Sequence, residues 1–275
     1  MRKFVLAFGF GLLLVGCSVS NPTNKLSSAS NEDMQQVEMP EGNVSEETLP
    51  DGVTEEKVSD KTDAYWVSLT YPQWKDEKYN VLNTAIATLI DTEFNGFVEQ
   101  EFFLDESSAA YGQYHLANVY EITAYTPNMI SVRFDFATYT GGAHGMQYSR
   151  SVNYALPIDK IIEIGLMEEA LPGFLNMASN FCSVQITQDL GEFSDKAMIA
   201  DGLAPNVQNF ATFTYVGDEA LEFTFDPYQV APYAAGPQVC YIELEEFRKA
   251  REAQAQNAEQ NTTETSVPME EDVTE

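Results

Sequence analysis

The chain has 275 residues, of which 43 are acidic and 14 are Lys or Arg, so its formal net charge at pH 7 is −29. Such a field disfavours nucleic acid and an anionic membrane surface as partners, and it would attract a basic protein or a cationic wall component. The same charge is equally consistent with the simpler role of keeping a secreted protein soluble.

The N-terminus has the pattern of an export signal. The dipeptide Arg2-Lys3 precedes an uncharged apolar run from Phe4 to Val15 that is too short to span a bilayer. The segment Leu14 to Cys17 resembles the bacterial lipobox, which implies that residues 1–17 are a lipoprotein signal peptide and that Cys17 is acylated. The alternative is an ordinary signal peptide followed by an incidental cysteine. The lipobox predicts a cell-envelope protein, lipid-anchored outside the cytoplasm, and Ser18 favours the outer membrane in a two-membrane organism.

Two acidic segments flank the central part of the chain. Residues 18–62 are rich in Ser, Asn, Glu, Asp and Pro and lack hydrophobic periodicity, so we expect a disordered tether. Residues 252–275 contain no Lys or Arg and predict a disordered acidic tail. The tether would hold the folded part away from the membrane.

Residues 63–155 predict strands and one long helix. An aromatic, alternating run at 64–74 indicates a first strand, and apolar residues at helical spacing indicate an amphipathic helix within 76–103. Alternating runs at 114–126, 129–140 and 146–156 then predict three antiparallel strands. The stretch FATYTGGAHGMQYS, which begins at Phe136, would form the second turn of this meander.

Residues 156–251 predict helices followed by strands. Helical periodicity covers 166–190 with a break at Pro172-Gly173, and a short helix follows at 195–199. Strand-like runs occupy 209–217, 219–238 and 239–244, and a charged helix comes last. Because strands and helices fall in separate runs, we predict an α+β fold with antiparallel sheet and packed helices, as one compact domain of two halves, 63–155 and 156–251.

Cys182 and Cys240 lie in the second half, and in an oxidising compartment a disulfide between them is as consistent with the sequence as two buried thiols.

His144 raises the question of chemistry, because it is one of only two histidines. Gly141 and Gly142 supply the positive φ that a tight turn needs, but a turn does not require His144. With His115 as the other histidine, there is no zinc-binding spacing such as HExxH, no G-x-S-x-G and no P-loop. Carboxylate pairs that involve Asp226 are weak evidence in so acidic a chain. We therefore predict no metal, no cofactor and no catalytic residue, which makes the chain a non-enzyme.

The second dense motif is FTFDPYQVAPYAAGPQ, from Phe223 to Gln238. Its prolines restrict the backbone, and Tyr228 and Tyr233 offer rigid amphipathic rings, which is a common way to build a contact surface. A purely structural corner with packed tyrosines explains the motif equally well.

The two motifs together resemble the RsiV-type extracellular domain, over about residues 64–246. The resemblance rests on YTGGAHG and, some 80 residues later, FTFDPYQVAPYAAG. It implies an α+β fold with a PdaC-like N-terminal half and a C-terminal half of formerly unknown function. In this family the domain occurs on a membrane-anchored anti-sigma factor that binds lysozyme, and beside the catalytic domain of peptidoglycan deacetylases. The anti-sigma factor's transmembrane helix has no counterpart here, and TFDPY at Thr224 lacks the second Asp of the deacetylase TFDDG element.

The leading hypothesis is an envelope lipoprotein that binds a cationic protein without catalysing a reaction, and the resemblance implies lysozyme-like muramidases as the class. Its membrane contact would be through the lipid only. The second hypothesis is a peptidoglycan-binding or glycan-binding accessory module, and the third is a hydrolase that depends on His144. The expected binding residues are Gly141, Gly142, His144, Tyr228, Pro232 and Tyr233.

Overall fold

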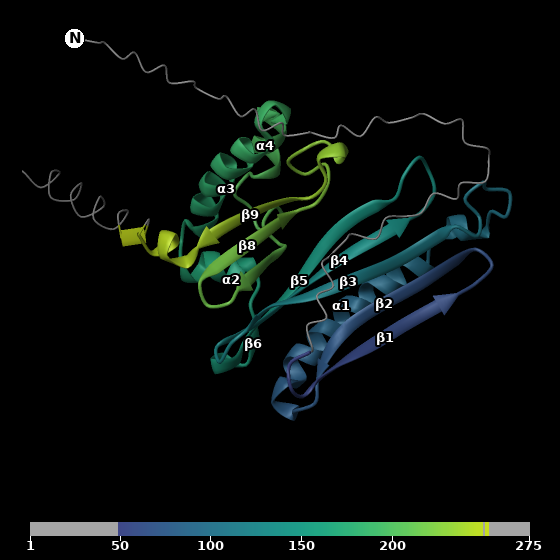
Figure 1. Ribbon diagram of the computed structural model, residues 1–275, viewed down its shortest axis with the longest axis horizontal. Helices are drawn as coiled ribbons and strands as arrows, with labels where there is room; N and C mark the ends of the chain where they lie inside the picture. The colour runs from purple at the N-terminus through teal and green to yellow at the C-terminus, as the bar shows by residue number, and fades with distance from the viewer. Residues whose placement is uncertain (1–48, 250, 253–275) are drawn as a thin grey trace, which may run out of the picture. The chain divides into compact units, whose positions relative to one another are not determined.

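The computed structural model describes residues 49–249 and 251–252, which form two β-sheets with packed helices (Figure 1). The predicted signal peptide with Cys17, most of the predicted tether and all but the first residue of the predicted tail lie outside these residues. The first sheet has the strand order β1-β2-β3-β4-β5-β6, and the second has the order β7-β8-β9. Within the described residues, no helix is both long and apolar enough to cross a membrane. The predicted α+β fold, as one compact domain, is confirmed.

The first sheet is built by the N-terminal half of the described chain. Its elements are β1 (Val53–Lys61), β2 (Tyr65–Trp74), α1 (Asn80–Val98), β3 (Tyr114–Tyr125), β4 (Met129–Tyr139), β5 (Met146–Ala155) and β6 (Lys160–Ile161). Neighbouring strands are antiparallel except β2 and β3, which pair in parallel because α1 carries the chain across the sheet between them. The predicted antiparallel pairing therefore does not hold at this one pair.

Strand β1 corrects the predicted extent of the tether. Residues 53–61 were expected to be disordered, yet all of them pair with β2 in one continuous register, from Val53 opposite Trp74 to Lys61 opposite Trp66. Val53 is the only buried side chain of this edge strand. The segment is ordered by its backbone pairing to an apolar neighbour, which a hydrophobicity pattern does not register.

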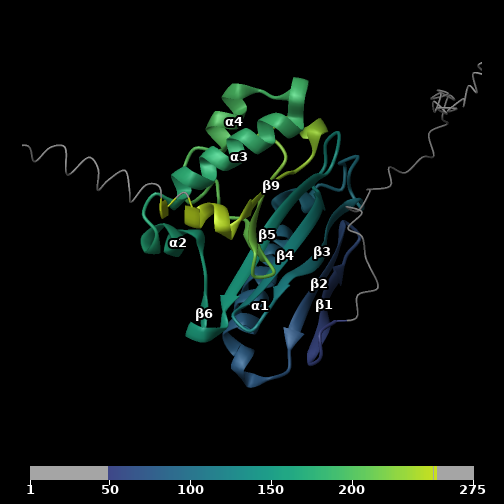
Figure 2. The same ribbon diagram turned by 60° about the vertical axis from the view of Figure 1, so that its left-hand side comes forward.

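Helix α1 packs on one face of this sheet (Figures 1 and 2). Leu82, Ile86 and Ile90 recur every four residues and are at most 1% exposed, and they share a core with Phe134 and Phe136 of β4. This is the apolar stripe that the sequence predicts, and it fixes which face of β4 is covered.

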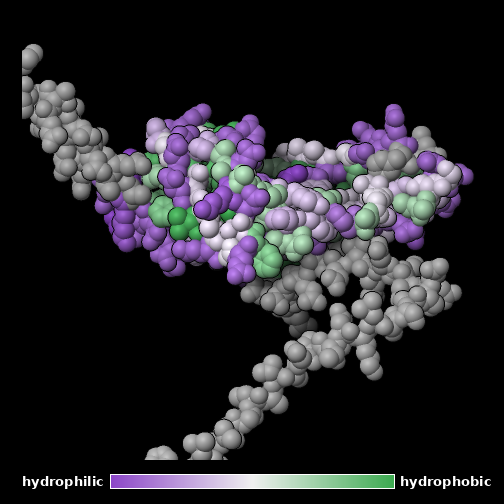
Figure 3. Space-filling view, turned by 90° about the horizontal axis from the view of Figure 1, so that it is seen from above, coloured by the Kyte–Doolittle hydropathy of each residue, from purple (hydrophilic) through white to green (hydrophobic). Residues whose placement is uncertain are grey.

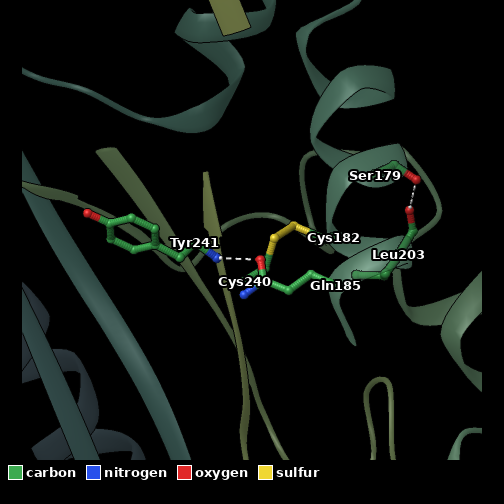
Figure 4. Close-up of a disulfide and its surroundings, with 6 residues drawn as sticks. All are labelled: Ser179, Cys182, Gln185, Leu203, Cys240 and Tyr241. Atoms are coloured by element: carbon green, nitrogen blue, oxygen red, sulfur yellow. Dashed lines mark hydrogen bonds between the residues drawn. A yellow bond between two sulfur atoms is a disulfide. The ribbon is translucent and has the colours of Figure 1, made fainter. Parts of the chain in front are cut away.

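The second half builds its own core around α3. Its elements are α2 (Ile164–Ala170), α3 (Phe174–Leu190), α4 (Lys196–Gly202), β7 (Phe213–Val216), β8 (Ala220–Phe225) and β9 (Gln238–Glu243). Residues 244–249 and 251–252 are helical. Short 3-10 helices occupy Glu77–Tyr79, Glu101–Leu104, Leu156–Ile158, Gly191–Phe193 and Tyr233–Ala235. Cys182 of α3 and Cys240 of β9 form a disulfide inside this core, with a Cα–Cα distance of 5.3 Å (Figure 4).

Polar side chains join the two halves along the edge of β5. The carboxylate of Asp226 accepts a hydrogen bond from the Ser149 backbone N–H at 2.8 Å, and Thr212 Oγ1 donates to the Ser149 carbonyl at 3.1 Å. Arg133 of β4 forms ion pairs with Glu121, Asp135 and Glu222. The second half therefore satisfies backbone groups that an open sheet edge would expose.

Candidate functional site

The connection between β4 and β5 is a glycine hairpin, residues 140–145. Gly141 and Gly142 have φ values of +96° and +103°, which residues with a Cβ rarely adopt. Tyr139 Oη donates to the Gly142 carbonyl at 3.1 Å. A Cβ on Gly145 would lie 2.9 Å from the Thr138 carbonyl oxygen, so this third glycine is required by a close backbone approach. The glycines thus fix the shape of the hairpin.

His144 is exposed at the tip of this hairpin. Its Nδ1 lies 2.8 Å from the Gly145 carbonyl oxygen. Because a carbonyl can only accept, Nδ1 carries the hydrogen, and Nε2 is the nitrogen left for a ligand. The other histidine, His115, is 4% exposed and stacks on Trp66 with ring centroids 4.8 Å apart, so it is a packed residue of the sheet.

The proline corner, residues 226–237, lies between β8 and β9. Its turn is closed by hydrogen bonds from the Gln229 N–H to the Asp226 carbonyl at 3.0 Å and from the Tyr228 N–H to the Ala231 carbonyl at 3.1 Å. Tyr228 has a φ of 72° and is 51% exposed. Pro232 is also exposed and caps the short helix that begins at Tyr233.

The structure brings the hairpin and the corner into contact. The rings of His144 and Tyr233 stack with centroids 4.0 Å apart and an interplanar angle of 21°. Tyr233 Oη also donates to the Gly145 carbonyl at 2.9 Å, across 88 residues of sequence. Tyr233 also contacts Tyr228, with ring centroids 5.6 Å apart. His144, Tyr233 and Tyr228 therefore form a continuous row of rings, which we call the aromatic row.

Contacts with α4 and with the segment that follows it hold the corner in place. Gln229 Nε2 donates to the carbonyls of Gly202 at 3.0 Å and Asn209 at 2.9 Å. The Gln229 carbonyl lies so close to Gly202 that a Cβ there would be 2.0 Å from its oxygen. Nothing in the local sequence pattern indicates this contact, so sequence reasoning did not find Gln229 or Gly202.

The carboxylate nearest in sequence to the aromatic row, Asp226, is already occupied. Besides the Ser149 N–H, it lies 3.5 Å from Arg150, which also pairs with Glu93 at 3.3 Å. Burial raises the pKa of the Asp226 carboxyl, and the Ser149 hydrogen bond and Arg150 oppose this shift. Burial and the hydrogen bond to Glu93 likewise raise the pKa of the Tyr148 phenol. Asp226, Arg150, Glu93 and Tyr148 thus form a cluster that joins the two halves. The Asp226 carboxylate is therefore not free to bind a ligand at the aromatic row.

Two family models match the described part of the chain. Residues 58–147 match the family model described as Deacetylase PdaC. Residues 153–245 match the model described as a protein of unknown function, DUF3298. The chain contains both domains. Together they point to a cell-wall-related extracellular module.

One curated relative is the Bacillus subtilis peptidoglycan-N-acetylmuramic acid deacetylase PdaC. It is 25% identical over 172 residues, which cover 62% of this chain and 36% of the relative. This chain therefore spans about a third of the relative's length.

Two solved structures of DUF3298-family proteins are also similar. One from Bacteroides fragilis has a TM-score of 0.50 and 17% identity, covering 71% of this chain and 91% of its own. One from Pseudomonas aeruginosa has a TM-score of 0.49 and 14% identity, covering 72% and 94%. At such identity, the B. fragilis structure supports the fold alone.

These matches correct the prediction that the chain is not an enzyme. The curated relative is named as a deacetylase, and the model matched by residues 58–147 is described by the same activity. The sequence lacks motifs such as HExxH and G-x-S-x-G. Such absences exclude particular mechanisms, but they do not exclude catalysis in general. Among the residues that the structure describes, no three His, Cys, Asp or Glu side chains are grouped as a metal ion would require.

Proposed function

We propose that this chain is a module of cell-wall metabolism that binds the glycan of peptidoglycan through its aromatic row. Two features support the proposal: the chain's PdaC and DUF3298 domains, and the continuous row formed by His144, Tyr233 and Tyr228. Sugar rings present apolar C–H faces that pack on aromatic faces, while their hydroxyl groups need nearby donors and acceptors. The row offers both, through its ring faces, the tyrosine hydroxyls and His144 Nε2.

The backbone conformation and the exposure of Tyr228 are the main support for the proposal. Its left-handed backbone conformation, φ 72°, costs a residue with a Cβ about 1 kcal/mol or more, and the residue is 51% exposed. A strained backbone that holds an aromatic ring in solvent gains nothing for the core. Such strain is typical of residues positioned for binding.

Retention on purified sacculi tests the proposal. The full chain is compared with a Tyr228→Ala, Tyr233→Ala double variant, and we expect at least a tenfold loss of retention. Tyr125→Ala is the matched control, because Tyr125 is exposed to a similar degree, 44% against 51% for Tyr228, but lies on β3, outside the corner. Unchanged retention of the double variant would refute glycan binding at the row.

A basic protein such as a lysozyme-like muramidase is the second candidate ligand, and the net charge of −29 favours it. The two candidates differ in their response to salt. Stacking on a sugar is little affected between roughly 50 and 500 mM NaCl, whereas attraction between opposite charges is largely screened over that range. Calorimetry of the full chain with lysozyme at low salt tests this candidate directly, and an absence of heat would remove it.

We also propose that Cys17 anchors the chain by lipid in the cell envelope, outside the cytoplasm. The proposal is supported by the lipobox-like segment Leu14 to Cys17 after the apolar run. Metabolic labelling with a radioactive fatty acid should mark the wild-type chain and leave a Cys17→Ser variant unlabelled. Equal labelling of both would contradict the proposed anchor.

A further inference from the structure

A groove lies between α3 and β9, beside the last residues of that strand. It has a volume of about 730 Å³, and its apolar lining includes Phe181 and Val184 of α3 and Tyr241 of β9. Val184 is 59% exposed and Tyr241 is 44% exposed. In the space-filling view, apolar patches lie between strongly hydrophilic ones on the left-hand part of the molecule (Figure 3). The groove therefore offers apolar surface that the fold itself leaves uncovered.

Strand β9 forms one wall of the groove and is an edge strand of the second sheet. Cys240 pairs with Phe223 of β8, and the Leu244 N–H donates to the Glu219 carbonyl at 2.8 Å. Because backbone groups alternate in direction along a strand, the odd-numbered residues Val239, Tyr241 and Glu243 point their backbone groups away from β8.

One of these outward groups already holds a substitute partner. The Tyr241 N–H donates to the side-chain oxygen of Gln185 on α3 at 3.1 Å (Figure 4). The amide of Gln185 thus takes the place that the backbone carbonyl of an added strand would take. The N–H groups of Val239 and Glu243, on either side, have no such acceptor within the described part of the chain.

The disulfide fixes the distance between the two walls. Cys182 and Cys240 join α3 directly to β9, one turn of helix away from Gln185 (Figure 4). A groove with a fixed width loses little conformational entropy when a segment enters it.

The rim of the groove is acidic. Glu243 and Glu246 line it, and an adjoining hollow that shares Tyr241 adds Asp218, Glu219 and Glu245. Arg248 is the one basic residue in these two linings, and it pairs with Glu245 at 2.6 Å and Glu252 at 3.4 Å. The remaining carboxylates make the groove selective for positive charge.

We propose that this groove binds an extended basic segment of a partner protein, which displaces the Gln185 amide from the Tyr241 N–H and adds a strand to β9. Apolar side chains of the segment would contact Phe181, Val184 and Tyr241, and its Lys or Arg residues would face Glu243 and Glu246. Edge-strand addition beside a helix obtains affinity from main-chain hydrogen bonds and specificity from alternate side chains. A second copy of this chain is disfavoured as the occupant, because it would bring the same acidic rim against itself.

The groove is a different surface from the aromatic row. The proline corner precedes β9, whereas the groove lies beside residues 241–243 and continues along the helix that starts at residue 244. A variant of one surface can therefore leave the other intact.

The probe is the alternating peptide acetyl-Lys-Val-Lys-Val-Lys-Val-Lys-amide, titrated by calorimetry into the full chain. We expect at least tenfold weaker binding for the same peptide with Glu in place of Lys. Val184→Lys should weaken binding of the Lys peptide at least tenfold, since it places a cation in the groove. Ile158→Lys is the matched control, because Ile158 is 58% exposed but lies outside the groove, and this variant should bind as the wild type does.

Hydrogen exchange then tests the geometry. Bound Lys peptide should slow exchange of the Val239 and Glu243 amides at least tenfold. Binding without this protection, or equal binding of the Glu peptide, would overturn the proposal. Dimers of the chain alone in sedimentation, with the same two amides protected, would also overturn it and assign the groove to a second copy.

Discussion

Gly202 allows a sharp test of how the proline corner is held. A Cβ at this position would lie 2.0 Å from the Gln229 carbonyl oxygen, and real Cβ atoms do not approach closer than 3.0 Å. In Gly202→Ala, α4 and the corner must therefore separate by about 1 Å at least, a distance that follows from those two values. Neither contact atom can rotate away, because the oxygen belongs to the backbone. We expect a loss near the upper end of the overpacking range, about 3 kcal/mol.

Thermal unfolding measures this loss. For about 200 ordered residues, 1 kcal/mol corresponds to roughly 2–4 °C, so Gly202→Ala should melt roughly 6–12 °C lower. The matched control is Gly96→Ala in α1, where a Cβ would meet nothing within 4 Å. It should melt about 1–4 °C higher, because Ala is favoured over Gly in a helix. If Gly202→Ala has the same melting temperature as the wild type, the close approach of the Gln229 carbonyl to Gly202 is wrong.

Three further predictions concern contacts that stabilise the second half or join it to the first. Reduction of the Cys182–Cys240 disulfide, which closes a loop with a sequence separation of 58, should lower the free energy of unfolding in urea. The chain-entropy model gives roughly 4 kcal/mol, and a reductant should leave the Cys182→Ala, Cys240→Ala variant unchanged. Arg133→Met should cost about 3 kcal/mol by thermal unfolding, because it leaves the half-buried Glu222 carboxylate without its cationic partner. Adding Glu222→Gln should recover part of this loss. Burial raises the pKa of Asp226 above 3.8, so its contribution to stability is largest below pH 3.8 and falls as the pH rises through the raised pKa. Asp226→Asn should remove that slope in urea titrations at several pH values.

Periodicity predicted most of the elements because most of them bury one clear face. The apolar spacing of Leu82, Ile86 and Ile90 defined α1, and the break at Pro172-Gly173 separated α2 from α3. Strand β1 was missed because only Val53 of its nine residues is buried. The parallel pairing of β2 with β3 was missed because it depends on the path of α1 across the sheet, which no local pattern records.

In the candidate site, too, local sequence patterns predict some features and miss others. Local rules explain the glycines of the hairpin, because positive φ at Gly141 and Gly142 is a property of the turn itself. The contact between His144 and Tyr233 depends on how the second half docks on β5, and no residue near either ring signals it. The same holds for Gln185, whose bond to the Tyr241 N–H appears only when α3 and β9 are side by side.

The two proposed surfaces differ in charge, and this separates them in one experiment. At the corner, Asp226 is held by the Ser149 N–H and Arg150, so little free charge from it reaches the aromatic row. At the groove, Glu243 and Glu246 have no basic partner among the described residues. A salt titration of the full chain should therefore leave sacculus retention nearly flat and weaken binding of the Lys peptide. If retention on sacculi falls with salt in parallel with peptide binding, charge governs both surfaces and stacking on the aromatic row does not account for the first.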